Sequence, residues 1–359
     1  MKKTLIAAAV LGMFAASVAS AQTANVTLYG RMNVSVESVS SKDSNSMGKI
    51  QRITSNDSRF GIRGSEDLGG GLSAIFQVES EIDADTSGAG LASRDTWAGL
   101  QGSWGSVKLG RMLTPYDALH GIWGNNTTAL SSILSTKTLW SAQSGQGYAL
   151  NFAGRPNNSI RYDSANLNGL TFAAQLSVNE NDRDTYLYSA NVIYSKDALQ
   201  LGAAVSYRDY GKDHGGGFTG DESDLGATIT AGYDFGFIRP AVVYEYAVVD
   251  DGDDSTSRHL AGLSLTAPIG AGKLYVAGVY ATKWRGDAGE AKSGAWQAEV
   301  SYTYALSKRT SVYAGYAMIQ NDKNAYYGLG SGTYAVAPKT SGDGKARPNG
   351  VVFGMIHNF

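Results

Sequence analysis

The amino-acid sequence predicts an all-β fold, a transmembrane barrel of sixteen antiparallel strands. Three observations lead to this prediction. Apolar and polar residues alternate over several segments, short turns alternate with long polar loops along the whole chain, and the last eleven residues form an alternating strand that ends on an aromatic residue. Strand alternation, an even strand number, and turns that are short at one end and long at the other are typical of bacterial outer-membrane barrels.

Alternation is clearest in three segments, Leu170–Val178, Leu199–Arg208 and Trp296–Tyr304. A period of two places successive side chains on opposite faces of a strand, so each segment has one apolar and one polar face. Soluble β-sandwiches also alternate. The spacing of the turns therefore carries more weight than the alternation itself.

Short turns and long loops follow one another in a regular order. The short turns are expected at residues 66–71, 102–105, 164–169, 195–198, 234–236, 267–272 and 305–309. The longer polar stretches are expected at residues 38–48, 83–92, 112–148, 179–185, 208–222, 250–256, 284–292 and 320–346. Together they connect sixteen strands, and a barrel of that size leaves an aqueous channel rather than a filled core.

The N-terminus has the three parts of a secretory signal peptide. Lys2 and Lys3 form a basic start, residues 5–14 are an apolar core, and Ala19-Ser20-Ala21 is an A-x-A cleavage site. A membrane anchor is the alternative, but the apolar run is too short to span a bilayer. We expect residues 1–21 to be removed and residues 22–359 to form one barrel domain.

Composition excludes several classes of protein. The chain has no cysteine, so disulfides and thiolate ligands are absent, and its formal net charge of −2 does not suit a nucleic-acid binder. The four histidines do not stand in a nucleophile constellation, so we expect no enzyme, no cofactor and no metal site. The acidic stretch Asp250–Asp254 lacks the spacing of a calcium loop and is expected to be a solvated loop.

Tyrosines gather near the predicted strand ends, where amphipathic rings form girdles at the membrane interfaces. They are Tyr29, Tyr186, Tyr188, Tyr194, Tyr207, Tyr233, Tyr244, Tyr246, Tyr280, Tyr302 and Tyr304. Pro240 removes a ladder donor from its strand, so it is expected near the strand start or at a bulge.

Five short motifs and the C-terminal strand resemble one known family. The motifs are residues 26–30 (VTLYG), 58–72 (SRFGIRGSEDLGGGL), 98–100 (AGL), 107–111 (VKLGR) and 159–163 (SIRYD), and the C-terminal strand carries His357 and the terminal Phe359. Together they resemble the Gram-negative general porins of the neisserial, bordetellal and burkholderial type.

The resemblance implies passive diffusion of small hydrophilic solutes and inorganic ions across the outer membrane through a homotrimer. It also implies that the third outer loop, residues 112–148, folds inward and forms the narrowest point. The strand ending in Phe359 is expected to serve as the signal for the barrel assembly machinery. Outer-membrane lipid and lipopolysaccharide are the expected surroundings.

Lumen charge at the narrowest point determines which ions pass. Strand parity places Arg59, Arg63 and Arg161 on the polar face, and Arg31 shares that parity on the first strand. Arg111 shares the parity of apolar residues, so its strand must bulge or end there. The resemblance assigns Arg59, Arg111 and Arg161 to the basic wall of the constriction, and Arg63 and Arg31 are weaker candidates.

The loop side of the constriction is poor in acidic residues. Its expected contributors are Pro115, Tyr116, Asp117, His120 and Lys137, of which Asp117 is the one acid between Met112 and Asn158. Three unbalanced arginines are then expected to give a weak to moderate anion preference. Glu79 and Glu81 share the inward parity of their strand and would reduce that preference if they reached the constriction.

Two alternatives remain open. A substrate-specific outer-membrane channel needs an aromatic track along the lumen, and no regular series of lumen-parity aromatics is evident in the sequence. A surface adhesin or antigen would use the long outer loops to bind host molecules, and loop mutations would separate that role from conduction.

Overall fold

A computed structural model describes residues 25–42, 48–86, 90–124, 132–140, 150–178, 186–210, 222–286, 293–330, 336 and 345–359. The expected signal peptide, residues 1–21, lies outside the described residues. So do parts of most of the long outer loops.

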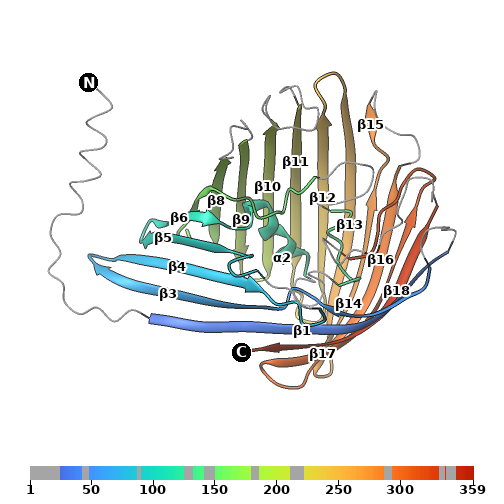
Figure 1. The fold of residues 1–359 in the computed structure, drawn as a ribbon, viewed down its shortest axis with the longest axis horizontal. Coiled ribbons are helices and arrows are strands. Elements are labelled where there is room, and N and C mark those ends of the chain that lie inside the picture. Colours follow the sequence, from blue (N-terminus) through green and yellow to red (C-terminus); the bar gives the residue numbers. More distant parts are fainter. Residues whose placement is uncertain are drawn as a thin grey trace.

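The described residues form one antiparallel sheet of eighteen strand segments (Figure 1). The segments are β1 (Asn25–Lys42), β2 (Ile50–Ser55), β3 (Arg59–Gly69), β4 (Leu72–Glu81), β5 (Thr96–Gly102), β6 (Gly105–Arg111), β7 (Ser159–Ser164), β8 (Leu170–Val178), β9 (Tyr186–Lys196), β10 (Leu199–Tyr210), β11 (Glu222–Tyr233), β12 (Arg239–Asp250), β13 (Ser255–Ile269), β14 (Gly272–Ala281), β15 (Arg285–Gly286), β16 (Ala295–Ala305), β17 (Thr310–Asn321) and β18 (Arg347–Asn358).

The eighteen segments make up sixteen barrel strands. β2 and β3 both pair with β1 and are two halves of one strand, interrupted at Asp57, where φ is +54°. β15 pairs with β13 beyond the end of β14 and so continues β14. β18 pairs with β1, which joins the two ends of the chain and closes the barrel (Figure 1). The predicted fold class is confirmed.

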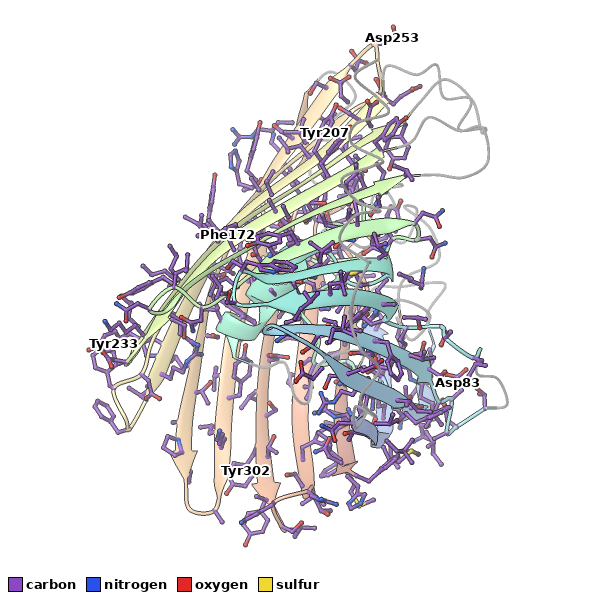
Figure 2. All side chains as sticks on the ribbon, turned by 90° about the vertical axis from the view of Figure 1, so that its left-hand side faces the viewer. Asp83, Phe172, Tyr207, Tyr233, Asp253 and Tyr302 are labelled. Atoms are coloured by element: carbon purple, nitrogen blue, oxygen red, sulfur yellow. The ribbon has the colours of Figure 1, made fainter. Side chains whose placement is uncertain are left out.

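All seven predicted short turns join consecutive strands at one end of the barrel, from the β3–β4 turn to the β16–β17 turn. The long connections lie at the other end. In Figure 2, Tyr233 and Tyr302 lie toward the end with short turns, and Asp253 lies at the opposite end. The third outer loop is longer than predicted, because β6 ends at Arg111 and β7 begins only at Ser159.

The two faces of the wall differ as the alternation predicts. Leu28, Leu109 and Phe353 face outward and are 64%, 58% and 64% exposed. The residues that alternate with them carry polar side chains that point inward, such as Gln175 and Ser177 on β8, which are buried. The wall is therefore apolar toward the membrane and polar toward the lumen, as in other transmembrane barrels.

Ten of the eleven predicted girdle tyrosines lie on the outward parity, and Tyr207 is one of those labelled in Figure 2. Tyr29 is the exception: its position pairs with Gly61, and its hydroxyl donates a hydrogen bond to Glu79 on the inner face. The girdle prediction is wrong for Tyr29, because its ring follows the inward parity of β1. Pro240 is the second residue of β12, near the strand start as predicted.

Two short helical segments follow β6 along the chain, η2 (Pro115–Leu119) and α2 (His120–Trp123). Both contact β10 and β11, with η2 also against β8 and β9 and α2 against β12. Figure 1 shows α2 enclosed by the curved sheet. Among the described residues, no helix has the length and hydropathy to cross a membrane.

Candidate functional site

Side chains of the inner wall hold the backbone of the helical segment between β6 and β7. The Asn191 amide donates to the Pro115 carbonyl at 2.7 Å, and the Arg239 guanidinium donates to the Ile122 carbonyl at 2.7 Å. Polar wall side chains thus satisfy loop carbonyls that would otherwise be buried unpaired. The segment is thereby fixed against β9 and β12.

The second described stretch of this loop, residues 132–140, packs on the other side of the interior. The Gln297 amide donates to the Ser135 carbonyl at 2.9 Å, and Arg258 donates to the Leu139 carbonyl. Ile133, Leu134, Leu139 and Trp140 are fully buried. Apolar burial and wall hydrogen bonds together dock the loop inside the barrel.

The interior contains a cluster of aromatic side chains that was not predicted. Its members are Tyr116, Trp123, Trp140, Tyr275, Tyr313 and Tyr327, all at most 4% exposed. Tyr275 and Tyr313 occupy the lumen parity on β14 and β17, positions that alternation alone did not single out. These rings pack in one buried cluster with the docked loop.

The charged residues of the loop form one compact group. Lys137 lies 2.6 Å from the Asp117 carboxylate, and His120 Nδ1 lies 3.6 Å from it. Burial would raise the pKa of the Asp117 carboxyl, but Lys137, His120 and then Arg155 lower it below its usual value. Asp117 is therefore ionised and largely neutralised by its own loop. The neighbouring Pro115 and Tyr116 are buried in the same turn.

The basic wall begins with a cross-strand row on the inner face. Arg31 on β1 pairs with Arg59 on β3, which pairs with Glu81 on β4. Arg59 Nε also lies 3.6 Å from the Glu79 carboxylate. Arg31 donates to the Asn358 side chain at 3.0 Å. The two glutamates expected to share the inward parity thus lie beside the arginines.

Arg94, which sequence reasoning missed, connects this row to the second outer loop. Its guanidinium lies 2.6 Å from Glu79 and 3.0 Å from Asp57, and the side chain is buried. Tyr29 donates to the second oxygen of Glu79 at 2.9 Å. Arg94 lies between strands, where alternation assigns no face, so no parity argument could have found it.

Arg111 lies where β6 ends. Gly110 before it has φ of +142°, a conformation that L-residues rarely adopt, and this break resolves the parity conflict noted in the sequence. Arg111 donates to the Asn157 side chain at 2.5 Å and to the Ser93 carbonyl at 3.3 Å. The nearby Arg155 is paired with Asp95 at 2.6 Å.

Arg161 lies on the inner face of β7 and holds the start of the loop. Two of its nitrogens donate to one oxygen of Asp163, at 2.9 and 2.6 Å, and a third donates to the Leu113 carbonyl at 2.8 Å. Lys108 on β6 reaches the other oxygen of Asp163 at 3.0 Å. One carboxylate therefore serves two cations.

These pairings correct the expectation of three unbalanced arginines. It is wrong for Arg59, which contacts Glu79, and for Arg161, which contacts Asp163. Within the described parts of the chain, Arg111 and Arg63 have no carboxylate at ion-pair distance. The basic wall therefore has excess positive charge at Arg111 and at Arg63. It also has an excess where two cations, Arg161 and Lys108, share the single carboxylate of Asp163.

The C-terminal residue closes the sheet against the first strand. The backbones of Phe359 and Gly30 exchange two hydrogen bonds of 3.0 Å, and the ring of Phe359 covers Gly30 so closely that a Cβ there would lie 2.2 Å from it. His357 Nδ1 lies 2.9 Å from the Thr310 hydroxyl. Both residues follow the outward parity expected of the terminal strand.

Across the ranges the structure describes, no group of three or more histidine, aspartate and glutamate side chains is placed to hold a metal ion. Asp251 and Asp254 of the acidic outer loop instead bond within their own turn.

Comparison with known sequences gives one consistent family. The profile described as Gram-negative porin matches residues 7–324. Outer membrane porin protein 32 of Delftia acidovorans is 32% identical over 381 aligned residues, with 100% of both chains covered. The major outer membrane protein P.IB of Neisseria meningitidis serogroup B is 29% identical, covering 70% of this chain and 85% of its own.

Solved structures show the same architecture. An anion-selective porin from Comamonas acidovorans superposes with a TM-score of 0.76 at 25% identity, covering 94% of this chain and 100% of the other. The trimer form of OmpT from Vibrio cholerae superposes with a TM-score of 0.70 at 16% identity, with the same coverage. The second likeness shows the fold alone.

Proposed function

Because the chain belongs to the Gram-negative porin family, we propose that its barrel is a general diffusion channel with a weak to moderate preference for anions. The protein is a porin of the outer membrane, and family and fold point to a channel rather than an enzyme. Small hydrophilic solutes and inorganic ions are its cargo.

The observation that carries the anion preference is the incomplete pairing of the basic wall. Arg63 and Arg111 have no carboxylate partner in the described residues, and Arg161 and Lys108 share Asp163. A unit charge about 7 Å from a passing ion contributes roughly 0.6 kcal/mol in water, about a threefold change in occupancy. The structural neighbour from Comamonas acidovorans is described as anion-selective, which supports the same assignment.

The docked loop and the basic wall together form the proposed constriction. Arg31, Arg59, Arg111 and Arg161 supply its basic side, and the loop residues Asp117, His120 and Lys137 supply a nearly neutral side. Because Asp117 is compensated within the loop, it offers passing cations little attraction. The field across the lumen is then set by the wall.

The assembly and export of the chain follow the family. We propose that residues 1–21 direct export, that Phe359 and His357 form the signal for the barrel assembly machinery, and that the barrel forms a homotrimer. The trimeric OmpT neighbour supports the last point. The exposed apolar outer face fits a surrounding of membrane lipid and lipopolysaccharide.

The test is the reversal potential of the purified channel in a planar bilayer under a KCl gradient. The wild type should give a potential of the sign set by chloride. Arg63→Glu/Arg111→Glu should move it toward the cation sign, because neither change leaves a carboxylate without its partner. Lys308→Glu, in the exposed β16–β17 turn, is the control and should leave the potential unchanged.

A cation-signed potential for the wild type would overturn the proposed selectivity, and would mean that Glu79 and Glu81 dominate the lumen. Absence of any conductance would overturn the channel function itself. It would favour the adhesin or antigen alternative.

A further inference from the structure

A shallow pocket of about 390 Å³ lies on the inner wall formed by β1 and β3 to β6, near the end with short turns. Arg63, Gln77 and Trp97 form one cross-strand row of its lining. Lys108, Gln101 and Ser106 line it from the following positions of β5 and β6. In transmembrane barrels the short turns face the periplasm, so the pocket opens toward that side.

Two cations of the pocket are placed against aromatic rings. The Arg63 guanidinium lies 5.1 Å from the ring centre of Tyr29, and the Lys108 ammonium lies 4.7 Å from that of Trp97. Lys108 is compensated by Asp163 at 3.0 Å. Arg63 is exposed, and in the described residues no carboxylate lies at ion-pair distance from it, so its donors remain available to a solute.

The other lining groups offer a solute hydrogen bonds and an aromatic surface in addition to the charge of Arg63. Gln77 and Gln101 offer amide donors and acceptors, and Ser106 offers a hydroxyl. Trp97 is half-buried, so part of its indole surface is open to the pocket. An inorganic anion would use only Arg63, whereas a hydroxylated organic anion would also use the amides and the indole.

We infer that this pocket is a binding subsite for sugar acids, that is, hydroxylated carboxylates of monosaccharide size. The carboxylate binds the planar fork of Arg63, which matches its geometry in a bidentate pair. The hydroxyl groups bond to Gln77 and Gln101, and a C–H face of the sugar packs on Trp97. This inference rests on the proposed channel function, since the solute reaches the subsite through an open lumen.

The experiment is solute-induced block of the open channel in a planar bilayer. Conductance and reversal potential are first measured in KCl alone, which tests the channel function separately. Glucuronate is then added to the side of the short turns and compared with glucose and with acetate. Glucuronate should block the current at lower concentration than either, because glucose lacks the carboxylate and acetate lacks the hydroxyl groups.

Three variants locate the binding. Arg63→Gln should weaken the glucuronate block about tenfold, and Trp97→Ala about fivefold. Lys273→Gln is the matched control. Lys273 is an inward-facing cation of β14 at the short-turn end of the barrel, like Arg63, but it lies outside the pocket. This variant should leave the block unchanged.

Either of two results would overturn the inference while the KCl measurements remain normal. Glucose or acetate blocking as well as glucuronate would show that the pocket does not combine charge and hydroxyl recognition. An equal loss of block in Lys273→Gln and Arg63→Gln would show that only the general field of the lumen acts.

Discussion

His120 is a buried base in a place that disfavours a second positive charge. Its ring lies 3.9 Å from the ring centre of Trp140, and its Nδ1 is 3.1 Å from the Asp117 carbonyl. Burial, followed by the charge of Lys137, lowers the pKa of His120 to about 4, against the opposing effect of Asp117. The docked loop is therefore built around a neutral imidazole.

This environment predicts a pH dependence of loop docking. The folded pKa of about 4 lies below the ordinary value near 6.5, so protons bind the undocked loop more readily. The stabilisation by neutral His120 is complete above about pH 6.5 and is lost as the pH falls toward 4, by up to roughly 3 kcal/mol. Single-channel current should be steady at neutral pH and should fluctuate increasingly over that interval.

His120→Gln should remove this dependence, because the amide keeps a hydrogen-bond donor and does not titrate in the interval. Current recordings of wild type and variant from pH 7 to pH 4 provide the measurement. A variant that fluctuates over the same interval as the wild type would assign the effect to another group. Asp117 titrates at lower pH, since its pKa is lowered too.

For individual residues, the sequence predicted which face of the strand a side chain takes, but not which side chains it contacts. Arg59 and Arg161 lie on the inner face as their parity indicates. Their pairing with Glu79 and Asp163 depends on register between strands, which alternation does not contain. The same parity argument, applied to β6, would have placed Lys108 on the inner face beside Arg161.

Among the elements, two parts of the third outer loop bond to one buried ion pair of the wall. Arg258 and Glu245, both 1% exposed at the side chain, lie 3.2 Å apart. Glu245 accepts a hydrogen bond of 2.5 Å from Tyr116, and Arg258 donates to the Leu139 carbonyl and to the Tyr327 hydroxyl. Two parts of the loop and the connection between β17 and β18 thus meet at one pair.

Breaking this pair should loosen the loop. Arg258→Met should lower the free energy of unfolding by about 3 kcal/mol or more, because it leaves the Glu245 charge buried without its cation. Arg258→Met/Glu245→Gln should recover at least half of that loss, since Gln can still accept from Tyr116. Urea unfolding in lipid vesicles, followed by tryptophan fluorescence, measures both.

Arg285→Met is the matched control, because Arg285 is exposed on β15, and its effect should stay within about 0.5 kcal/mol. If the double variant were as unstable as Arg258→Met alone, the loss would come from packing of the arginine stem. The buried charge would then not be the cause.

The terminal strand depends on a close contact between Gly30 and the ring of Phe359. Gly30→Ala should displace the ring and lower the folded yield several-fold, and Phe359→Ala should have a similar effect. Gly278→Ala is the control, because the nearest atom to its Cβ would be the Gln297 carbonyl oxygen at 3.9 Å. Folded and unfolded fractions can be separated by the heat-dependent mobility of the barrel in gel electrophoresis.

Equal yields for Gly30→Ala and Gly278→Ala would contradict this reading. The ring contact would then not contribute to closure. The two backbone hydrogen bonds between Phe359 and Gly30 would suffice.

The element order could be predicted because turns and alternation are local signals. Six of the seven short turns contain Gly, Asn, Asp or Pro, and the seventh, residues 305–309, is a short run with Ser, Lys and Arg. The strands between them follow. The interruption between β2 and β3 could not be predicted, since it depends on hydrogen bonds that Asn56 and Ser58 form with the backbone of Asn33 on the neighbouring strand. The docking of the loop likewise depends on wall residues more than 70 positions away.

Across the whole molecule, the inner wall is electrostatically uneven. The part built from β1 to β7 carries the incompletely paired cations Arg63 and Arg111. It also carries Arg161 and Lys108, which share the one carboxylate of Asp163. On the facing part, Arg258 and Arg208 are paired with Glu245 and Asp224. A solute crossing the lumen therefore meets a group of incompletely paired cations on the β1–β7 side, of which Arg63 is exposed.

A field that acts through water should be screened by salt. The Debye length falls from about 10 Å at 0.1 M to about 3 Å at 1 M ionic strength, so exposed charges on the wall lose most of their influence on passing ions over that range. At a constant tenfold KCl ratio, the reversal potential of the wild type should decrease as the mean concentration rises from 0.1 M to 1 M. Arg63→Glu/Arg111→Glu should show a smaller change, because less excess charge remains to be screened. A wild-type potential independent of concentration would mean that selection occurs at direct contacts, where bound ions shed water and bulk screening no longer applies.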